Sequence, residues 1–75
     1  MTPTINMKAT GENIDKLMKE RRLSKRDIQA VCGFTTVQTI YKWVHGRCLP
    51  TVDNLLVLSY LFGVRIDDIL VIENR

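Results

Sequence analysis

Two polar side chains four residues apart are the first feature of this sequence that could do chemistry. Gln38 and Lys42 lie in the run Val37–His45, where Ile40 and Val44 are spaced as on one face of a helix. The same spacing places Gln38 and Lys42 together on the opposite face. A glutamine amide can form two hydrogen bonds to adenine in the major groove, and a lysine can reach guanine O6 and N7. These residues are suited to reading DNA bases, although a solvated helix face often carries the same types.

The sequence offers little for metal binding or catalysis. Cys32, His45 and Cys48 lack a C-x-x-C pair and a fourth ligand, so we expect no metal and no other cofactor. Cys32 falls at an apolar position of a short expected helix and Cys48 falls in a loop, and both thiols are expected to be reduced. One histidine, no Gly-rich phosphate loop and no carboxylate pair on a shared face argue against an enzyme.

Positive charge is concentrated in the first two thirds of the chain. The net charge is +3, but residues 1–50 hold nine Lys or Arg against four acids (+5), and residues 51–75 hold two against four (−2). This segregation favours a polyanionic partner, and a solvated basic helix face is the alternative. No apolar run approaches the roughly 18 residues that cross a membrane, and residues 1–9 lack the apolar core of a secretory signal. We therefore expect a cytoplasmic protein.

Short helices separated by turn signals must position these side chains. The helix limits that the caps and glycines predict are Thr10 (N-cap) to about Arg22, Ser24 (N-cap) to Gly33, Thr35 or Thr36 (N-cap) through Val37 to His45, Thr51 (N-cap) through Val52 to Phe62, and about Ile66 to Val71. The apolar positions expected to face inward are Ile14, Leu17, Met18, Ile28, Val31, Cys32, Ile40, Val44, Leu55, Leu58, Phe62, Ile66, Ile69 and Leu70, with Val37 and Trp43 on the flank. Five helices with loops this short predict an all-α fold, a compact orthogonal bundle.

The chain is expected to form one domain, residues 10–75, preceded by an N-terminal arm of residues 1–9. The sequence leaves three alternatives open for this arm: it is flexible, it pairs with a partner, or it folds back on the domain.

The second and third expected helices flank Gly33 and a tight turn, which is the arrangement of a helix-turn-helix. A series of residues at characteristic spacing extends over about three-quarters of the chain: Ile14, Leu17, Ser24, Ile28, Gly33, Ile40-Tyr41-Lys42-Trp43, Gly46, Pro50, Leu55, Leu58, Leu61-Phe62-Gly63-Val64 and Asp68-Ile69-Leu70. In these residues, from Ile14 to Leu70, the sequence resembles the Cro/C1-type (XRE family) helix-turn-helix domain of bacterial and phage repressors. The resemblance implies a lambda-repressor-like fold and sequence-directed binding to double-stranded DNA.

The resemblance also implies roles for individual residues. Thr36, Val37, Gln38 and Lys42 stand where the family reads bases, and Thr39 shares the outer face. Lys25 stands where the family touches phosphate after the cap of the second helix, and His45 and Arg47 stand where it contacts the DNA backbone. Tyr41 is expected either to pack at the rim or to donate a hydrogen bond to a phosphate.

The sequence departs from the family's usual pattern in three respects. The stretch from Gly33 to Ile40 is one residue longer, and Arg65 replaces the usual Ser cap of the last helix. Met18 and Val44 replace an Arg and a Glu that commonly form an ion pair between the first and third helices. Because replacing both partners of such a pair with apolar residues is often neutral or stabilising, we expect Met18 and Val44 to make one hydrophobic contact.

These observations predict a DNA-binding transcriptional regulator, a repressor, with an interaction module such as an antitoxin or adaptor as the alternative. A single helix-turn-helix reads only a few base pairs, so a homodimer is expected. Ile69, Val71 and Ile72 are the candidates for its two-fold interface, and the alternative is that this segment caps the monomer core.

Overall fold

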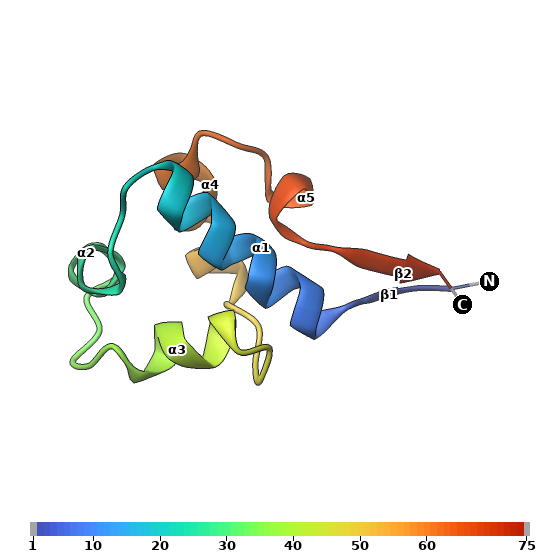
Figure 1. The fold of residues 1–75 in the computed structure, drawn as a ribbon, viewed down its shortest axis with the longest axis horizontal. Coiled ribbons are helices and arrows are strands. Elements are labelled where there is room, and N and C mark those ends of the chain that lie inside the picture. The colour runs from blue at the N-terminus through green and yellow to red at the C-terminus, as the bar shows by residue number, and fades with distance from the viewer. Residues whose placement is uncertain (1, 75) are drawn as a thin grey trace.

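The computed structural model describes residues 2–74, which form five helices and one two-stranded ribbon (Figure 1). In chain order the elements are β1 (Pro3–Ile5), α1 (Met7–Glu20), α2 (Lys25–Cys32), α3 (Gln38–Val44), α4 (Val52–Phe62), α5 (Ile66–Ile69) and β2 (Ile72–Asn74). In Figure 1, α1 crosses the centre of the molecule and the ribbon projects from one end. The predicted all-α, five-helix bundle is confirmed, and the ribbon is a small addition that the sequence analysis did not predict.

Helix α1 begins earlier than the sequence suggested, and the prediction of Thr10 as its N-cap is wrong. Asn6 is the N-cap, and its side-chain Oδ1 accepts a hydrogen bond from the Ala9 N–H at 2.9 Å. Thr10 is fully buried, and its hydroxyl accepts a hydrogen bond from the Val71 N–H at 2.9 Å. A threonine that resembles a cap in sequence therefore serves a contact with a segment 61 residues away.

The residues before α1 fold back on the end of the chain. β1 pairs with β2 in antiparallel register, with Ile5 opposite Ile72 and Pro3 opposite Asn74. The Asn6 N–H donates to the Val71 carbonyl at 2.8 Å, which continues the pairing to the start of α1. The two described ends of the chain consequently lie side by side (Figure 1).

The predicted ends of α2 and α4 are confirmed. Ser24 and Asp27 form a reciprocal capping box at the start of α2, with hydrogen bonds of 2.8 and 3.1 Å. The Thr51 hydroxyl accepts the Asn54 N–H at 3.3 Å at the start of α4. Gly33 and Gly63 end the two helices with φ of 72° and 68°, the left-handed conformation that glycine adopts at little cost.

The hydrophobic core joins all five helices. Its buried members are Ile14, Leu17, Met18, Ile28, Ile40, Trp43, Leu55, Leu58, Phe62 and Ile69. Val31 was expected to face inward but is 56% exposed, because α2 is short and its buried stripe is limited to Ile28 and the partly buried Cys32. Ile69 is fully buried in the core, so its prediction as part of a two-fold interface is wrong.

Helix α5 is shorter than predicted, because hydrogen bonds from α1 turn the chain away after Ile69. The Asn13 side chain donates to the carbonyls of Asp68 and Ile69 at 2.8 and 3.0 Å, and Leu70 is extended. At the other end, the Asp68 carboxylate accepts the Arg65 N–H at 3.1 Å. This bond fixes the start of α5 although position 65 lacks a serine.

Candidate nucleic-acid interface

The candidate interface is built on α2, the turn after Gly33 and α3. At its far end, α3 stops where Gly46 has φ of 71°. The N–H groups of Gly46 and Arg47 donate to the carbonyls of Trp43 and Lys42 at 3.0 and 2.9 Å. These two bonds satisfy carbonyls that a helix end leaves free, and they hold Arg47 close to the end of α3.

The start of α3 differs from the prediction by one residue. Val37 is the N-cap, in a right-handed helical conformation, and no side chain caps the helix there. The Thr36 hydroxyl accepts the Gln38 N–H at 3.3 Å, so it orders the turn without being the cap itself. Helix α3 therefore begins at Gln38.

The side chains predicted to read bases lie at and just before α3. Thr36, Gln38 and Lys42 are exposed, whereas Val37 and Thr39 are half-buried. Gln38 and Lys42 are one turn apart on a helix whose other face carries the buried Ile40 and Trp43.

The side chains predicted to touch phosphate form two groups. Arg47 is exposed just beyond α3. Tyr41 and His45 are also exposed, and their rings stack with centroids 6.2 Å apart and planes 13° from parallel. The Lys25 ammonium lies 5.1 Å above the Tyr41 ring centroid, at the distance of a cation–π contact. The structure therefore brings Lys25, Tyr41 and His45 together on the flank of α3.

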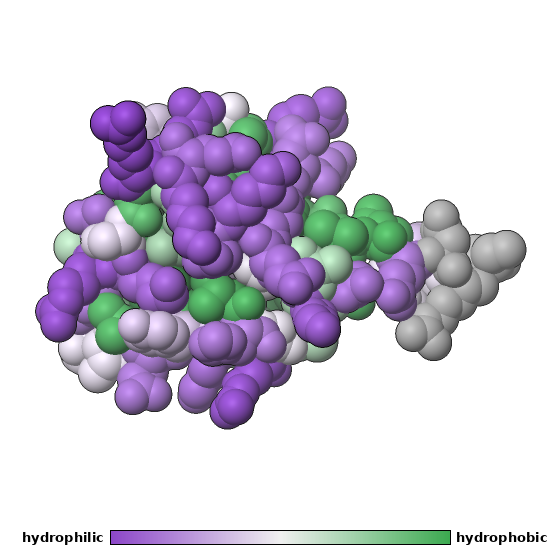
Figure 2. Space-filling model, in the orientation of Figure 1, coloured by the Kyte–Doolittle hydropathy of each residue, from purple (hydrophilic) through white to green (hydrophobic). Residues whose placement is uncertain are grey.

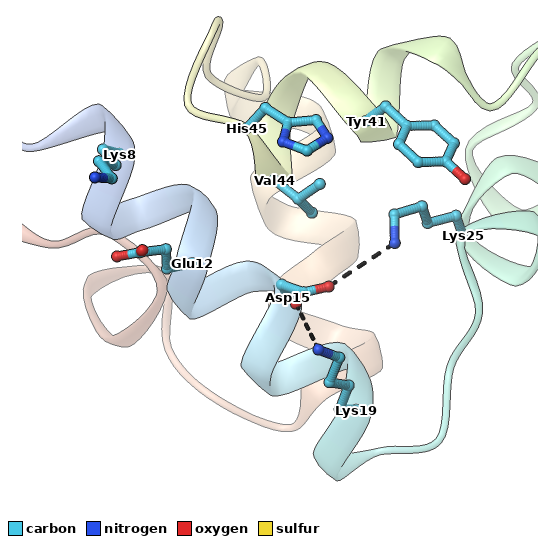
Figure 3. A pocket seen from close by; sticks show the side chains of 8 residues that line it. All are labelled: Lys8, Glu12, Asp15, Lys19, Lys25, Tyr41, Val44 and His45. Carbon is cyan, nitrogen blue, oxygen red and sulfur yellow. Dashed lines mark ion pairs between the residues drawn. The ribbon is translucent and has the colours of Figure 1, made fainter.

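This flank borders an open hollow of about 520 Å³ between α1 and α3 (Figure 3). Its lining residues are Lys8, Glu12, Asp15, Lys19, Lys25, Tyr41, Val44 and His45. The Asp15 carboxylate forms ion pairs with two lysines, with Oδ2 2.9 Å from Lys19 Nζ and Oδ1 3.8 Å from Lys25 Nζ. The role of Asp15 could not be predicted from sequence, because no pattern along one helix indicates that its carboxylate faces a lysine on another.

Close packing of α1 against α3 sets the position of this surface. The two helices cross at Gly11, where an added Cβ would lie 2.4 Å from the Trp43 carbonyl oxygen. Trp43 is 2% exposed and packs edge-to-face on Phe34, which confirms its expected place in the core. Met18 is buried and Val44 packs on the same core cluster, and their direct contact stays a prediction.

Two titratable groups of α2 have pKa values that differ from their ordinary ones for identifiable reasons. The Ser24 backbone N–H, and after it the Ser24 side chain, lower the pKa of the Asp27 carboxyl below its ordinary 3.8. Because the folded-state pKa is the lower one, this cap stabilises α2 above the unfolded pKa and is lost as pH falls through the folded value. Burial raises the pKa of the Cys32 thiol above its ordinary value.

Residues 2–74 contain neither a cluster of metal ligands nor a membrane-spanning helix. Within this range, no three His, Cys, Asp or Glu side chains gather as a metal site would require. No helix among the described residues has the length and apolar character needed to span a membrane.

The chain is similar to known proteins in sequence and in structure. A sequence profile of the Cro/C1-type helix-turn-helix DNA-binding domain matches residues 13–74. The restriction-modification controller protein C.AhdI from Aeromonas hydrophila has a similar structure, with a TM-score of 0.73 and 14% identity over 85% of this chain and 96% of that one. The DNA-binding domain of BldD is also similar, with a TM-score of 0.69 and 18% identity over 87% of this chain and 93% of that one. No curated protein matches the chain by sequence.

Proposed function

Because the chain belongs to the Cro/C1-type helix-turn-helix DNA-binding family, we propose that it is a sequence-specific transcriptional regulator, a repressor that reads the major groove with residues 36–45. The observation that carries the proposal is the two-faced character of α3. Gln38 and Lys42 are exposed on one side, while Ile40 and Trp43 anchor the other side in the core. A helix fixed in this way can present polar groups to base edges without rearranging.

The candidate residues divide into two roles. Gln38 and Lys42 lie within α3, with Thr36, Val37 and Thr39 beside them, so this group is suited to the groove floor. Arg47, His45, Tyr41 and Lys25 lie at helix ends or on the flank of α3, where phosphates run past an inserted helix. Repression would follow from occupancy, since a bound domain excludes other proteins from its site. Binding, not catalysis, is the activity that we propose.

A protein-interaction module is the second candidate, and α4 carries the observation that favours it. Val52, Leu56 and Tyr60 recur at i, i+4 and i+8 and are 76%, 63% and 86% exposed. An exposed apolar stripe of this kind is typical of a surface that another protein covers.

Base reading and phosphate contact can be tested separately with Gln38→Ala and Arg47→Ala. Selection from random DNA supplies the preferred site, and both variants are titrated against that site and a scrambled one at several salt concentrations. We expect Gln38→Ala to lose about 1–3 kcal/mol of discrimination at one base position. Arg47→Ala should weaken binding to both DNAs alike and reduce the salt slope by about one.

Each outcome has a clear reading. An unchanged preferred-to-scrambled ratio in Gln38→Ala would mean that α3 does not read bases through this residue. If the unmodified protein has no preference for any sequence, the interaction module becomes the better proposal.

A further inference from the structure

The Lys25 side chain is turned toward the body of the protein. Its ammonium lies between the Tyr41 ring, 5.1 Å from the centroid, and Asp15, 3.8 Å from Oδ1 (Figure 3). The side chain is 27% exposed, compared with 77% for Lys19, which meets the same carboxylate. Of the two lysines beside Asp15, Lys25 is therefore the one whose charge is held within the hollow.

Lys25 is also the first residue of α2, next to the Ser24 cap and alongside α3. This is where the proposed DNA complex would bring a phosphate. The Asp15 carboxylate comes from α1 and offers Lys25 the same kind of partner that a phosphate oxygen offers, an anionic acceptor for an ammonium. An ammonium drawn toward the carboxylate is less available to DNA.

We infer that Asp15 is a positioning residue that holds Lys25 in the hollow of the free protein and competes with DNA phosphate for its ammonium. The inference rests on the proposed function and adds a determinant of affinity to it. Because phosphate contacts carry no base information, the competition lowers affinity for every sequence equally. Asp15 thus limits non-specific binding to DNA without altering which sequence is preferred.

The main test is Asp15→Asn, which removes the charge and keeps the shape. We expect this variant to bind the preferred and the scrambled DNA about 2- to 5-fold more tightly, the range that an exposed ion pair spans. The dependence of log affinity on log salt should steepen by about one, because the freed lysine displaces a further counterion. The ratio of the two affinities should stay as it is. Asp15→Glu, which keeps the charge, should bind as the unmodified protein does.

Glu12→Gln is the matched control for the general effect of charge. Glu12 lies on the same helix, lines the same hollow and forms no ion pair with the described residues. If Glu12→Gln tightens binding as much as Asp15→Asn, the effect is overall charge and the inference is wrong.

A double-mutant cycle tests whether Asp15 acts through Lys25. The gain in DNA affinity from Asp15→Asn should disappear in a Lys25→Gln background and persist in a Lys19→Gln background. A gain that persists without Lys25 would overturn the inference. If the unmodified protein binds DNA and Asp15→Asn changes nothing, the inference alone fails, whereas absence of any DNA binding by the unmodified protein would overturn the proposed function and the inference together.

Discussion

Gly11 shows how one residue can fix the position of the proposed recognition surface. An added Cβ there would lie 2.4 Å from the Trp43 carbonyl oxygen and 2.7 Å from that of Val44, and backbone atoms cannot move aside as a side chain can. The glycine therefore permits the close approach of α1 to α3. This role could not be predicted from sequence, because Gly11 falls in the first turn of a helix expected to start at Thr10, where a glycine attracts no notice.

Replacing Gly11 with alanine should destabilise the protein. Alanine is a better helix former than glycine by about 1 kcal/mol, but the overpacking should outweigh this gain and lower the free energy of unfolding by about 1–3 kcal/mol. Denaturant melts measure the difference. Glu12→Ala, at the exposed neighbouring position, should stay within about 0.5 kcal/mol of the unmodified protein. A Gly11→Ala protein as stable as the unmodified one would show that the two helices are farther apart than this.

At the scale of elements, the end of α1 differs from the ends of the other helices. Arg22 has φ of 56°, and the N–H groups of Arg22 and Leu23 donate to the carbonyls of Lys19 and Met18 at 3.1 and 2.9 Å. This is the pattern that closes α2 at Gly33, but here a residue with a Cβ occupies the left-handed position. Such a conformation costs an L-residue roughly 1–2 kcal/mol.

We expect Arg22→Gly to relieve this strain. Glycine has greater conformational freedom in the unfolded chain, and this offsets part of the relieved strain. The net increase in the free energy of unfolding should therefore be about 0.5–1 kcal/mol. Arg21→Gly is the matched control, because Arg21 has φ of −94° and gains nothing from glycine. In thermal melts, the melting temperature should therefore rise for Arg22→Gly and fall for Arg21→Gly. A lower melting temperature in both variants would show that Arg22 is not strained.

The elements that could be predicted from sequence are those whose signals lie within a few residues. Ser24 with Asp27 begins α2 and Thr51 begins α4, and both caps are local hydrogen bonds. The ribbon could not be predicted, since three-residue strands are too short to show an alternating pattern. Thr10 was misread because its partner, Val71, is distant in sequence.

The candidate site also has features that could be predicted from sequence and features that could not. The exposure of Gln38 and Lys42 follows from the period of the helix, and it was predicted. The inward position of Lys25 depends on Asp15 in α1 and Tyr41 in α3, so no segment of the sequence contains the information.

At the scale of the whole molecule, we propose that a second copy of the chain binds at the ribbon. Ile5 and Ile72 are opposite each other in the pairing and are 39% and 58% exposed, and Val71 is half-buried beside them. Figure 2 shows hydrophobic surface near the ribbon on a face that is otherwise largely hydrophilic. With Ile69 in the core, Val71 and Ile72 are the remaining members of the proposed two-fold contact.

Sedimentation with palindromic DNA tests this contact. We expect two protein chains per duplex for the unmodified protein and weaker assembly for Ile72→Thr, since threonine preserves the strand but removes apolar area. Leu56→Ser, on the exposed stripe of α4, should assemble normally. If Leu56→Ser alone prevents assembly, the second copy binds at α4, and a strict one-to-one complex would remove the dimer proposal.

The pairing of β1 with β2 also determines how the protein responds to mechanical force. Because the strands are antiparallel, Pro3 and Asn74 lie at the same end of the ribbon. A tensile load between the two ends of the chain therefore acts across the strands and separates the residue pairs in succession, without shearing them all together. The helices experience no tension until Ile5 and Ile72 have parted and the hydrogen bond from Asn6 to Val71 has broken, so the helix-turn-helix can remain folded while the ribbon opens.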